Sequence, residues 1–468
     1  MSKEKNTDLG SGSVGKLLFK LAAPAIIAQL VNVLYNIVDR IFIGRMENGG
    51  MAMAGVGVAF PIILIISAFS ALVGMGGAPL AAIKMGENDN DGAEKIMSNS
   101  FSVLMILAVV LTGGFLIFKE PVLWAFGASQ ETIGYALEYL SVYLIGTVFV
   151  QIALGMNPYI NTQGFAKVGM MTVAIGAIIN IVLDPILIFG LNMGVKGAAL
   201  ATITAQAVSA IWVLRFLFGK KSVLKIKKKY LKPDIKIVLP ILALGVAPFI
   251  MQATESLVLV SLNSQLQKYG GDIAVGSMTI MSSIMQMILL PNTGLTQGAQ
   301  PIISYNYGAK NMDRVKKTFK LTLGLACSYT LLMWALLMTV PHVFVSVFNN
   351  NDPAIMAATT EAIKIYFAGM ILFGAQMACQ QTFLALGQAK ISLVLALLRK
   401  VILLVPLIFI LPMLMKTNQL NAVLLAEPIA DILAVITTIT CFTIFYKKTL
   451  ANVGNEDKSI KVETIRSN

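Results

Sequence analysis

Hydrophobic residues run in long stretches along this chain, separated by short joints rich in polar residues, glycine, proline and asparagine. Twelve stretches reach the roughly 20 residues that a helix needs to cross a hydrocarbon core about 30 Å thick. They lack the alternation of barrel strands, and open strands leave backbone groups unsatisfied in lipid. The pattern predicts an all-α integral membrane protein with twelve transmembrane helices at 17–43, 52–78, 97–118, 134–158, 168–190, 194–218, 237–262, 273–302, 318–341, 360–385, 391–414 and 420–446.

The amino-acid composition indicates that lipid surrounds most of this chain. Charged residues make up 13% of the 468 residues and hydrophobic residues 57%, whereas soluble domains carry about 25% charged residues. This balance excludes a secreted disulfide scaffold and a disordered chain. One histidine, His342, and three dispersed cysteines, Cys327, Cys379 and Cys441, are too few for a His/Cys metal centre or a histidine-based triad.

The net charge of +13 comes from 36 Lys and Arg against 23 Asp and Glu. Most of the basic residues fall on joints that the spans place on one side, and the positive-inside rule makes that side cytoplasmic. Polar segments 1–16 and 447–468 are then cytoplasmic tails, and no nucleic-acid partner is needed. The lysine-rich segment 219–236 is predicted as a cytoplasmic linker that either contacts anionic lipid headgroups or is simply solvated.

The chain repeats itself across this linker. Ala23-Pro24 recurs as Ala247-Pro248 at an offset of 224 residues. Nearly the same offset relates Gly76 to Gly298 and Gly164-x-Ala166-Lys167 to Gly387-x-Ala389-Lys390. The offsets predict two pseudo-symmetric six-helix lobes, 17–218 and 237–446, arranged as the parallel repeats of a transporter. Such a duplication suits alternating access within a monomer. Pro24 and Pro248 are predicted to bend equivalent helices.

A polar stripe follows the first span. Its members fall within an arc of about 80° on the helix: Gln29, Asn32, Asn36 and Asp39. The first three are predicted to line the substrate pathway. Asp39 is either an ion or proton site, or a carboxylate solvated at the outer interface or paired with Arg40 or Arg45.

Oxygen-bearing side chains from neighbouring spans lie at a similar depth. Asn180 and Asp184 are one helical turn apart, just before Pro185, and Thr202 lies on the next span. Carboxylate, amide and hydroxyl oxygens suit Na⁺, and two close carboxylates also suit a proton. We therefore expect Asp39 and Asp184 to bind a coupling ion that is Na⁺ or H⁺.

The second half carries its own ionisable groups. Glu255 and Gln252 share a face of the seventh span and serve either as an ion or substrate site or in helix packing. Basic and acidic residues of the last two spans form either internal salt bridges or a charge-compensated gate. The second-lobe candidates are Glu255, Gln252, Arg399, Lys400, Glu427 and Asp431.

Three motifs carry a family resemblance. The run from Leu34 to Gly44 (LYNIVDRIFIG), the segment from Leu183 to Ile188 (LDPILI) and the joint from Gly194 to Ala199 (GVKGAA) resemble the MATE (multidrug and toxic compound extrusion) family, in its bacterial MepA-like and DinF-like branches. The resemblance implies a V-shaped, two-lobed antiporter of the plasma membrane. It implies export of cationic and amphipathic drugs in exchange for Na⁺ or H⁺, without any other cofactor.

The resemblance also implies site residues. The first-lobe cation site falls on Asp39, Asn180, Asp184, Thr202, Tyr139 and Asn157. In the NorM branch a second site pairs acids of the seventh and tenth helices. Glu255 matches the first acid, but the tenth span offers Cys379, Gln380 and Gln381 and no carboxylate there, which favours coupling through the first lobe.

Three alternatives remain open. A flippase for a lipid-linked precursor, or an exporter of an endogenous metabolite, shares the architecture, but a pyrophosphate needs more cavity cations than Arg399 and Lys400. An intramembrane protease with paired aspartates is disfavoured because Asp39 and Asp184 lack a Gly-x-Gly-Asp context and because enzymes do not need the duplication. A channel is the third.

Overall fold

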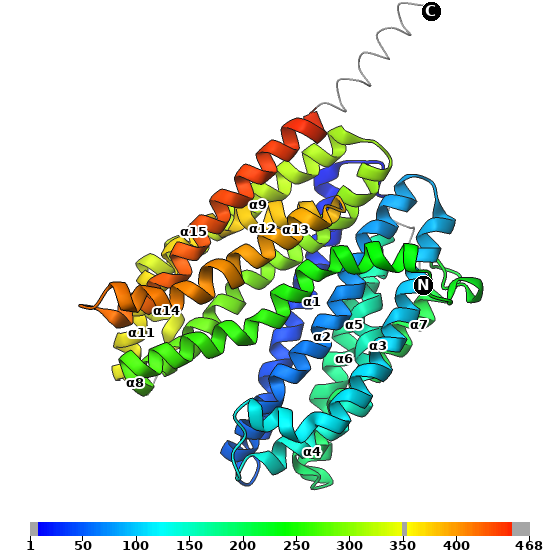
Figure 1. The fold of residues 1–468 in the computed structure, drawn as a ribbon. Helices are drawn as coiled ribbons and strands as arrows, with labels where there is room; N and C mark the ends of the chain where they lie inside the picture. Colours follow the sequence, from blue (N-terminus) through cyan, green and yellow to red (C-terminus); the bar gives the residue numbers. More distant parts are fainter. Residues whose placement is uncertain (1–7, 349–352, 452–468) are drawn as a thin grey trace, which may run out of the picture. The chain divides into compact units, whose positions relative to one another are not determined.

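The computed structural model describes residues 8–348 and 353–451, which are helical apart from turns and short joints (Figure 1). No strand occurs within these residues. The ends of the predicted cytoplasmic tails, 1–7 and 452–468, lie outside the described residues. An all-helical fold follows from the apolar runs, because a helix satisfies its own backbone hydrogen bonds in lipid.

The helices of the first half agree with the predicted spans within a few residues at most ends. A break at Gly146 bends the fourth predicted span, 134–158, by 60° into two helices. A side-chain cap starts the third helix, because Asp89 accepts a hydrogen bond from the Gly92 amide at 2.8 Å. The elements are α1 (Val14–Gly44), α2 (Gly49–Gly86), α3 (Asn90–Ala125), α4 (Ile133–Ile145), α5 (Thr147–Thr162), α6 (Ala166–Pro185), η1 (Ile186–Gly190), α7 (Gly194–Leu217) and η2 (Lys228–Tyr230).

The second half begins with α8 (Ile235–Gly308), a 74-residue element that consists of two helices joined at a kink. Its backbone leaves the helical conformation at Gly271, where φ is 64° and ψ is −159°. Glycine suits this position because it has no Cβ to clash at positive φ. The remaining elements are α9 (Met312–Thr339), α10 (Pro341–Ser346), α11 (Pro353–Tyr366), η3 (Ala368–Leu372), α12 (Phe373–Ala385), α13 (Ala389–Leu397), η4 (Leu398–Leu404), α14 (Val405–Leu414), α15 (Gln419–Phe445) and η5 (Tyr446–Ala451).

Nine helices of the described chain are long and apolar enough to cross a membrane, or eleven when each of two bent helix pairs is one span. The longest element, α8, is counted as one helix in this total, although its 74 residues, at a rise of 1.5 Å each, would extend about 110 Å. The break at Gly271 falls in the predicted joint between 237–262 and 273–302. The multi-span fold is confirmed, and the count of twelve stays a prediction.

Contacts divide the chain into two compact units. The first contains Lys20–Ala253, and the second contains Leu9–Phe19 together with the described residues from Thr254 onward. These divisions run through α1 and α8, not through the 219–236 linker. The predicted lobes 17–218 and 237–446 therefore describe the sequence repeat, whereas the units describe the packing. Pro24 and Pro248 both lie inside continuous helices, and a bend at either stays a prediction.

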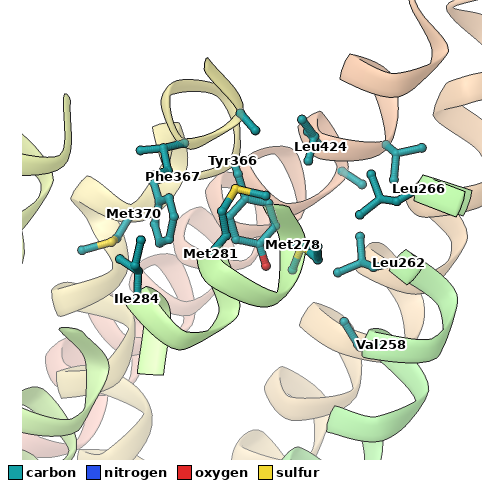
Figure 2. Packing of buried hydrophobic residues seen from close by; sticks show 14 of the residues in the cluster. Val258, Leu262, Leu266, Met278, Met281, Ile284, Tyr366, Phe367, Met370 and Leu424 are labelled. Carbon is teal, nitrogen blue, oxygen red and sulfur yellow. The ribbon is translucent and has the colours of Figure 1, made fainter. Parts of the chain in front are cut away.

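Each unit has its own apolar core. In the first unit, buried residues of α2 and α4 pack together, among them Ile62, Ile66 and Leu140. In the second, the buried Met278 and Met281 of α8 pack beside the aromatic rings of Tyr366 and Phe367 (Figure 2). Methionine fills such irregular spaces because its unbranched side chain adapts its shape.

Two helices of the first unit approach each other closely at glycines. A Cβ added to Gly245 of α8 would lie 1.7 Å from the carbonyl oxygen of Leu72 in α2. A Cβ on Gly76 of α2 would lie 2.2 Å from the carbonyl oxygen of Ile241. Backbones meet here because neither glycine has a side chain, which is a common basis of helix association in membranes.

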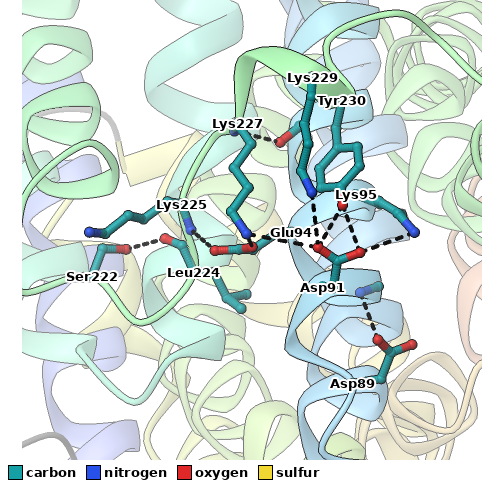
Figure 3. A network of polar contacts seen from close by, with 12 residues as sticks. Asp89, Asp91, Glu94, Lys95, Ser222, Leu224, Lys225, Lys227, Lys229 and Tyr230 are labelled. Atoms are coloured by element: carbon teal, nitrogen blue, oxygen red, sulfur yellow. Dashed lines mark hydrogen bonds and ion pairs between the residues drawn. The ribbon is translucent and has the colours of Figure 1, made fainter.

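The basic linker folds back onto the first unit (Figure 3). The side-chain oxygen of Gln163 accepts hydrogen bonds from Ser222 Oγ at 2.9 Å and from the amides of Val223 and Leu224 at 2.8 and 2.9 Å. Glu94 accepts from the Lys225 amide at 3.1 Å. These bonds anchor segment 222–225 to the first unit, and contact of the linker with lipid headgroups stays a prediction.

Side chains of the linker add ion pairs on α3. Lys227 pairs with Glu94, and this hydrogen bond raises the pKa of the Lys227 ammonium. The Tyr230 hydroxyl donates to the Asp91 carboxylate at 2.6 Å, and Lys229 lies 3.6 Å from the same group. These contacts connect the linker to α3.

The segment that leads into α1 is held in a comparable way by the second unit. Arg314 of α9 donates to the carbonyl oxygens of Gly12 at 2.7 Å and Ser11 at 2.9 Å. Asn306 of α8 donates to the carbonyl oxygen of Leu9 at 2.9 Å. The segment before α1 is therefore held by side-chain bonds to its backbone carbonyl groups.

Candidate functional site

Two carboxyl groups meet inside the first unit. Asp39 of α1 and Asp184 of α6 lie close enough to interact electrostatically, and Asp184 is completely buried. Two carboxylates that lie close together in a low-dielectric interior repel each other, which favours a proton on one of them. The arrangement therefore suits one bound proton, or a cation that takes the place of that proton.

An amide and two hydroxyl groups complete this cluster. Asn180 Nδ2, one turn before Asp184, donates to Asp184 Oδ1 at 3.2 Å and lies 3.5 Å from Thr202 Oγ1 of α7. Tyr139 of α4 lies near Thr202 and Asp39. Tyr139 is buried and its ring stacks on Tyr143 at a centroid distance of 6.2 Å. Four helices thus supply oxygen atoms to one place.

Several oxygens of the cluster are buried without a hydrogen-bond partner in the described chain. They are Asp39 Oδ1, Asn180 Oδ1 and Asp184 Oδ2. An acceptor buried without a donor costs roughly 1–3 kcal/mol, so a bound proton or cation at these oxygens would stabilise the fold. Carboxylate, amide and hydroxyl oxygens are the ligands that small hard cations prefer.

The other first-half candidates are distributed along the same helices. Gln29 and Asn32 are half-buried on α1, and the side chain of Asn36 lies outside what the structure describes. Asn157 of α5 donates to the carbonyl oxygen of Gly169 in α6 at 3.3 Å, instead of to the cluster. The structure therefore brings five of the six predicted cation-site residues together, and ion binding by them stays a prediction.

A second charged cluster lies in the second unit. Arg399, in the π-helical turn η4, donates to Asp431 Oδ1 at 2.7 Å and to Glu427 Oε1 at 3.0 Å, both on α15. Its guanidinium lies over the ring of Phe373, 4.7 Å from the centroid. The predicted internal salt bridges are confirmed, and the gate stays a prediction.

The neighbouring Lys400 forms an ion pair with Glu255 of α8. The sequence did not predict this pairing, because residues 255 and 400 share no periodicity that would reveal it. Tyr366 was also missed; it is buried and interacts electrostatically with Glu255, Glu427 and Asp431. Gln252, one turn before Glu255, is half-buried.

Comparison with known proteins shows a family match in both halves of the chain. Residues 24–186 and 247–410 each match the MatE family model. The two matches begin at positions separated by almost the same offset that relates Ala23-Pro24 to Ala247-Pro248. The sequence repeat is therefore confirmed by two copies of one family unit.

Curated relatives and solved structures agree with this match. The multidrug export protein MepA of Staphylococcus haemolyticus is 28% identical over 424 residues, which cover 90% of this chain and 92% of MepA. A solved structure of the MATE multidrug transporter DinF-BH is 35% identical, with a TM-score of 0.87 over 96% of this chain and 98% of that one. A MOP superfamily transporter from Pyrococcus furiosus is 25% identical, with a TM-score of 0.87 over 96% of this chain and 100% of that one.

Proposed function

This chain belongs to the MatE family of membrane transporters, which are not enzymes, and from that premise we propose that it is a secondary multidrug antiporter. It exports cationic and amphipathic drugs in exchange for Na⁺ or H⁺. The observation that carries the coupling is the buried contact of Asp39 and Asp184 beside Asn180. The names of the MepA and DinF-BH relatives support the drug substrates.

The proposed cycle uses competition between ion and drug. In the outward-open state a cation enters and neutralises the Asp39 and Asp184 carboxyl pair. The Pro24 helix then repacks, the first-lobe cavity narrows and the drug leaves outward. The carrier turns inward, releases the ion and binds a new drug. Ion and drug must weaken each other's binding reciprocally, and such couplings are typically worth about 1–3 kcal/mol.

The proposal also covers the membrane location, the number of chains and the kind of substrate. We place the chain in the plasma membrane with both termini in the cytoplasm, because Lys and Arg concentrate on the joints of that side. Transport requires one chain, since both repeats of the family unit are present in it. Small organic molecules are the substrates, and lipid is the surrounding solvent.

The salt bridges of the second unit argue against the flippase alternative. Arg399 is held by two carboxylates and Lys400 is paired with a third. A pyrophosphate would have to compete with all three acids for these cations.

Dye transport into or out of proteoliposomes tests the antiport proposal. We expect ethidium flux to follow an imposed Na⁺ or pH gradient in the wild type and to fall by at least about tenfold in Asp39→Asn and Asp184→Asn, because each change removes an ionisable oxygen from the pair. Asp272→Asn, at an exposed aspartate beside Gly271, is the matched control and should leave the flux unchanged. Gradient-driven flux that survives loss of both aspartates would refute coupling at this pair.

A further inference from the structure

The Glu255–Lys400 ion pair is built asymmetrically. The side chain of Glu255 is 51% exposed, whereas that of Lys400 is 10% exposed. Both residues lie in helices apolar enough to cross a membrane. A carboxylate facing lipid would be very costly, so an exposed one on such a helix faces water. The carboxylate is therefore the accessible end of the pair, and the ammonium is the buried end.

The surroundings of the pair contain ionisable groups of both signs. Arg399 is bound by Glu427 and Asp431, with side chains between 3% and 11% exposed. Glu255 interacts electrostatically with Arg399, and Glu427 interacts with both Glu255 and Lys400. Acidic and basic groups thus border the Glu255–Lys400 pair, and a charge added to the pair or removed from it changes the electrostatic energy of these neighbours.

This arrangement discriminates between ligand charges. A ligand with only a positive charge would pair with Glu255 and push the Lys400 ammonium away from its carboxylate, next to Arg399. A ligand with only a negative charge would take Lys400 and leave Glu255 near Glu427. A ligand with both charges avoids each penalty, because its ammonium contacts Glu255 while its carboxylate contacts Lys400. Every charge then keeps an opposite neighbour.

We propose that Glu255 and Lys400 form a substrate subsite in the second unit that selects zwitterions, small amphipathic molecules carrying one ammonium and one carboxylate. The inference rests on the proposed function, since it names a substrate class for an exporter of small organic molecules. It assigns Lys400 as a residue that determines specificity, separate from the ion-coupling pair in the first unit.

Two rhodamine probes that differ only in one charge test the proposal. Tetramethylrhodamine is a zwitterion at neutral pH, in which a cation delocalised over two dimethylamino groups takes the place of the ammonium, and its methyl ester carries the positive charge alone. Binding of each probe to the full-length chain in nanodiscs is measured by fluorescence anisotropy, with empty nanodiscs as the blank. In Lys400→Gln we expect the zwitterion to bind about tenfold more weakly, since a hydrogen bond to a charged group is lost. The ester should bind as before or more tightly.

A double variant guards against misfolding caused by an unpaired carboxylate. Glu255→Gln combined with Lys400→Gln leaves two neutral amides that can still bond to each other, and it should show the same loss for the zwitterion. The matched control is Glu361→Gln with Lys364→Gln, the same two changes at exposed positions of α11. This control should bind both probes as the wild type does.

The results separate this inference from the proposed function. Loss of zwitterion binding with retained ester binding supports the subsite. Equal loss of both probes, no loss of either, or a wild type that does not bind the zwitterion overturns it, even where the ester is still exported under an ion gradient. Absence of ion-driven ester export refutes the antiport proposal, whatever the binding data show.

Discussion

The buried Arg399 cluster offers a prediction whose size follows from its geometry. Arg399→Leu removes two charge-assisted hydrogen bonds, at 2.7 and 3.0 Å, and a cation–π contact at 4.7 Å. It also leaves the carboxylates of Glu427 and Asp431 buried without their cation. Removing one partner from a buried ion pair costs about 3–5 kcal/mol, mostly because the remaining charge is uncompensated. We expect the second unit to lose stability by about this amount.

A triple variant distinguishes the loss of the attraction to Arg399 from the cost of leaving two carboxylates buried without a cation. Arg399→Leu combined with Glu427→Gln and Asp431→Asn removes all three charges, and we expect it to recover most of the lost stability, to within about 1–2 kcal/mol of the wild type. The assay is thermal and denaturant unfolding of the purified chain in detergent, followed by intrinsic fluorescence. A single variant that loses less than about 1 kcal/mol, or a triple variant no more stable than the single one, would refute this reasoning.

Two further predictions concern the first unit. Gly245→Leu would place a Cβ 1.7 Å from a backbone oxygen of α2, so the two helices must separate. We expect this variant to unfold at a lower temperature than the wild type, as measured by scanning fluorimetry. The control Gly113→Leu, at a glycine with open space around it, should unfold near the wild-type temperature. Gln163→Ala removes the acceptor of three linker hydrogen bonds. It should speed tryptic cleavage within 219–236 several-fold, whereas the exposed Gln130→Ala should not; equal cleavage rates would contradict the anchoring role.

Local features of the sequence were enough to predict the spans and the repeat, because a membrane helix needs a long apolar run and a duplication leaves matching motifs. The convergence of Asp39 and Asp184 could be expected from their similar depth on two spans. The anchoring of the linker by Gln163 could not be predicted, since an amide just after the end of α5 gives no sign of a partner some 60 residues away. The same holds for Glu255 and Lys400, whose pairing depends on how α8 and η4 pack.

The sequence predicted the break at Gly271 but not the 60° bend at Gly146. Gly271 lies in a polar joint between two apolar runs, where an interruption is expected. Gly146 lies inside one apolar run, and a glycine in a membrane helix is as often a packing position as a break. Hydropathy therefore located one interruption and missed the other.

The division of α1 and α8 between the two units also bears on how the chain arose. Residues Leu9–Phe19 belong with the second unit, and the beginning of α8, up to Ala253, belongs with the first. The start of each repeat's first helix thus belongs to the unit that the other repeat mainly forms. A single-repeat ancestor with the same packing would complete its unit only by exchanging that segment with a second copy, as domain-swapped dimers do. Gene fusion would then have joined two subunits that already depended on each other.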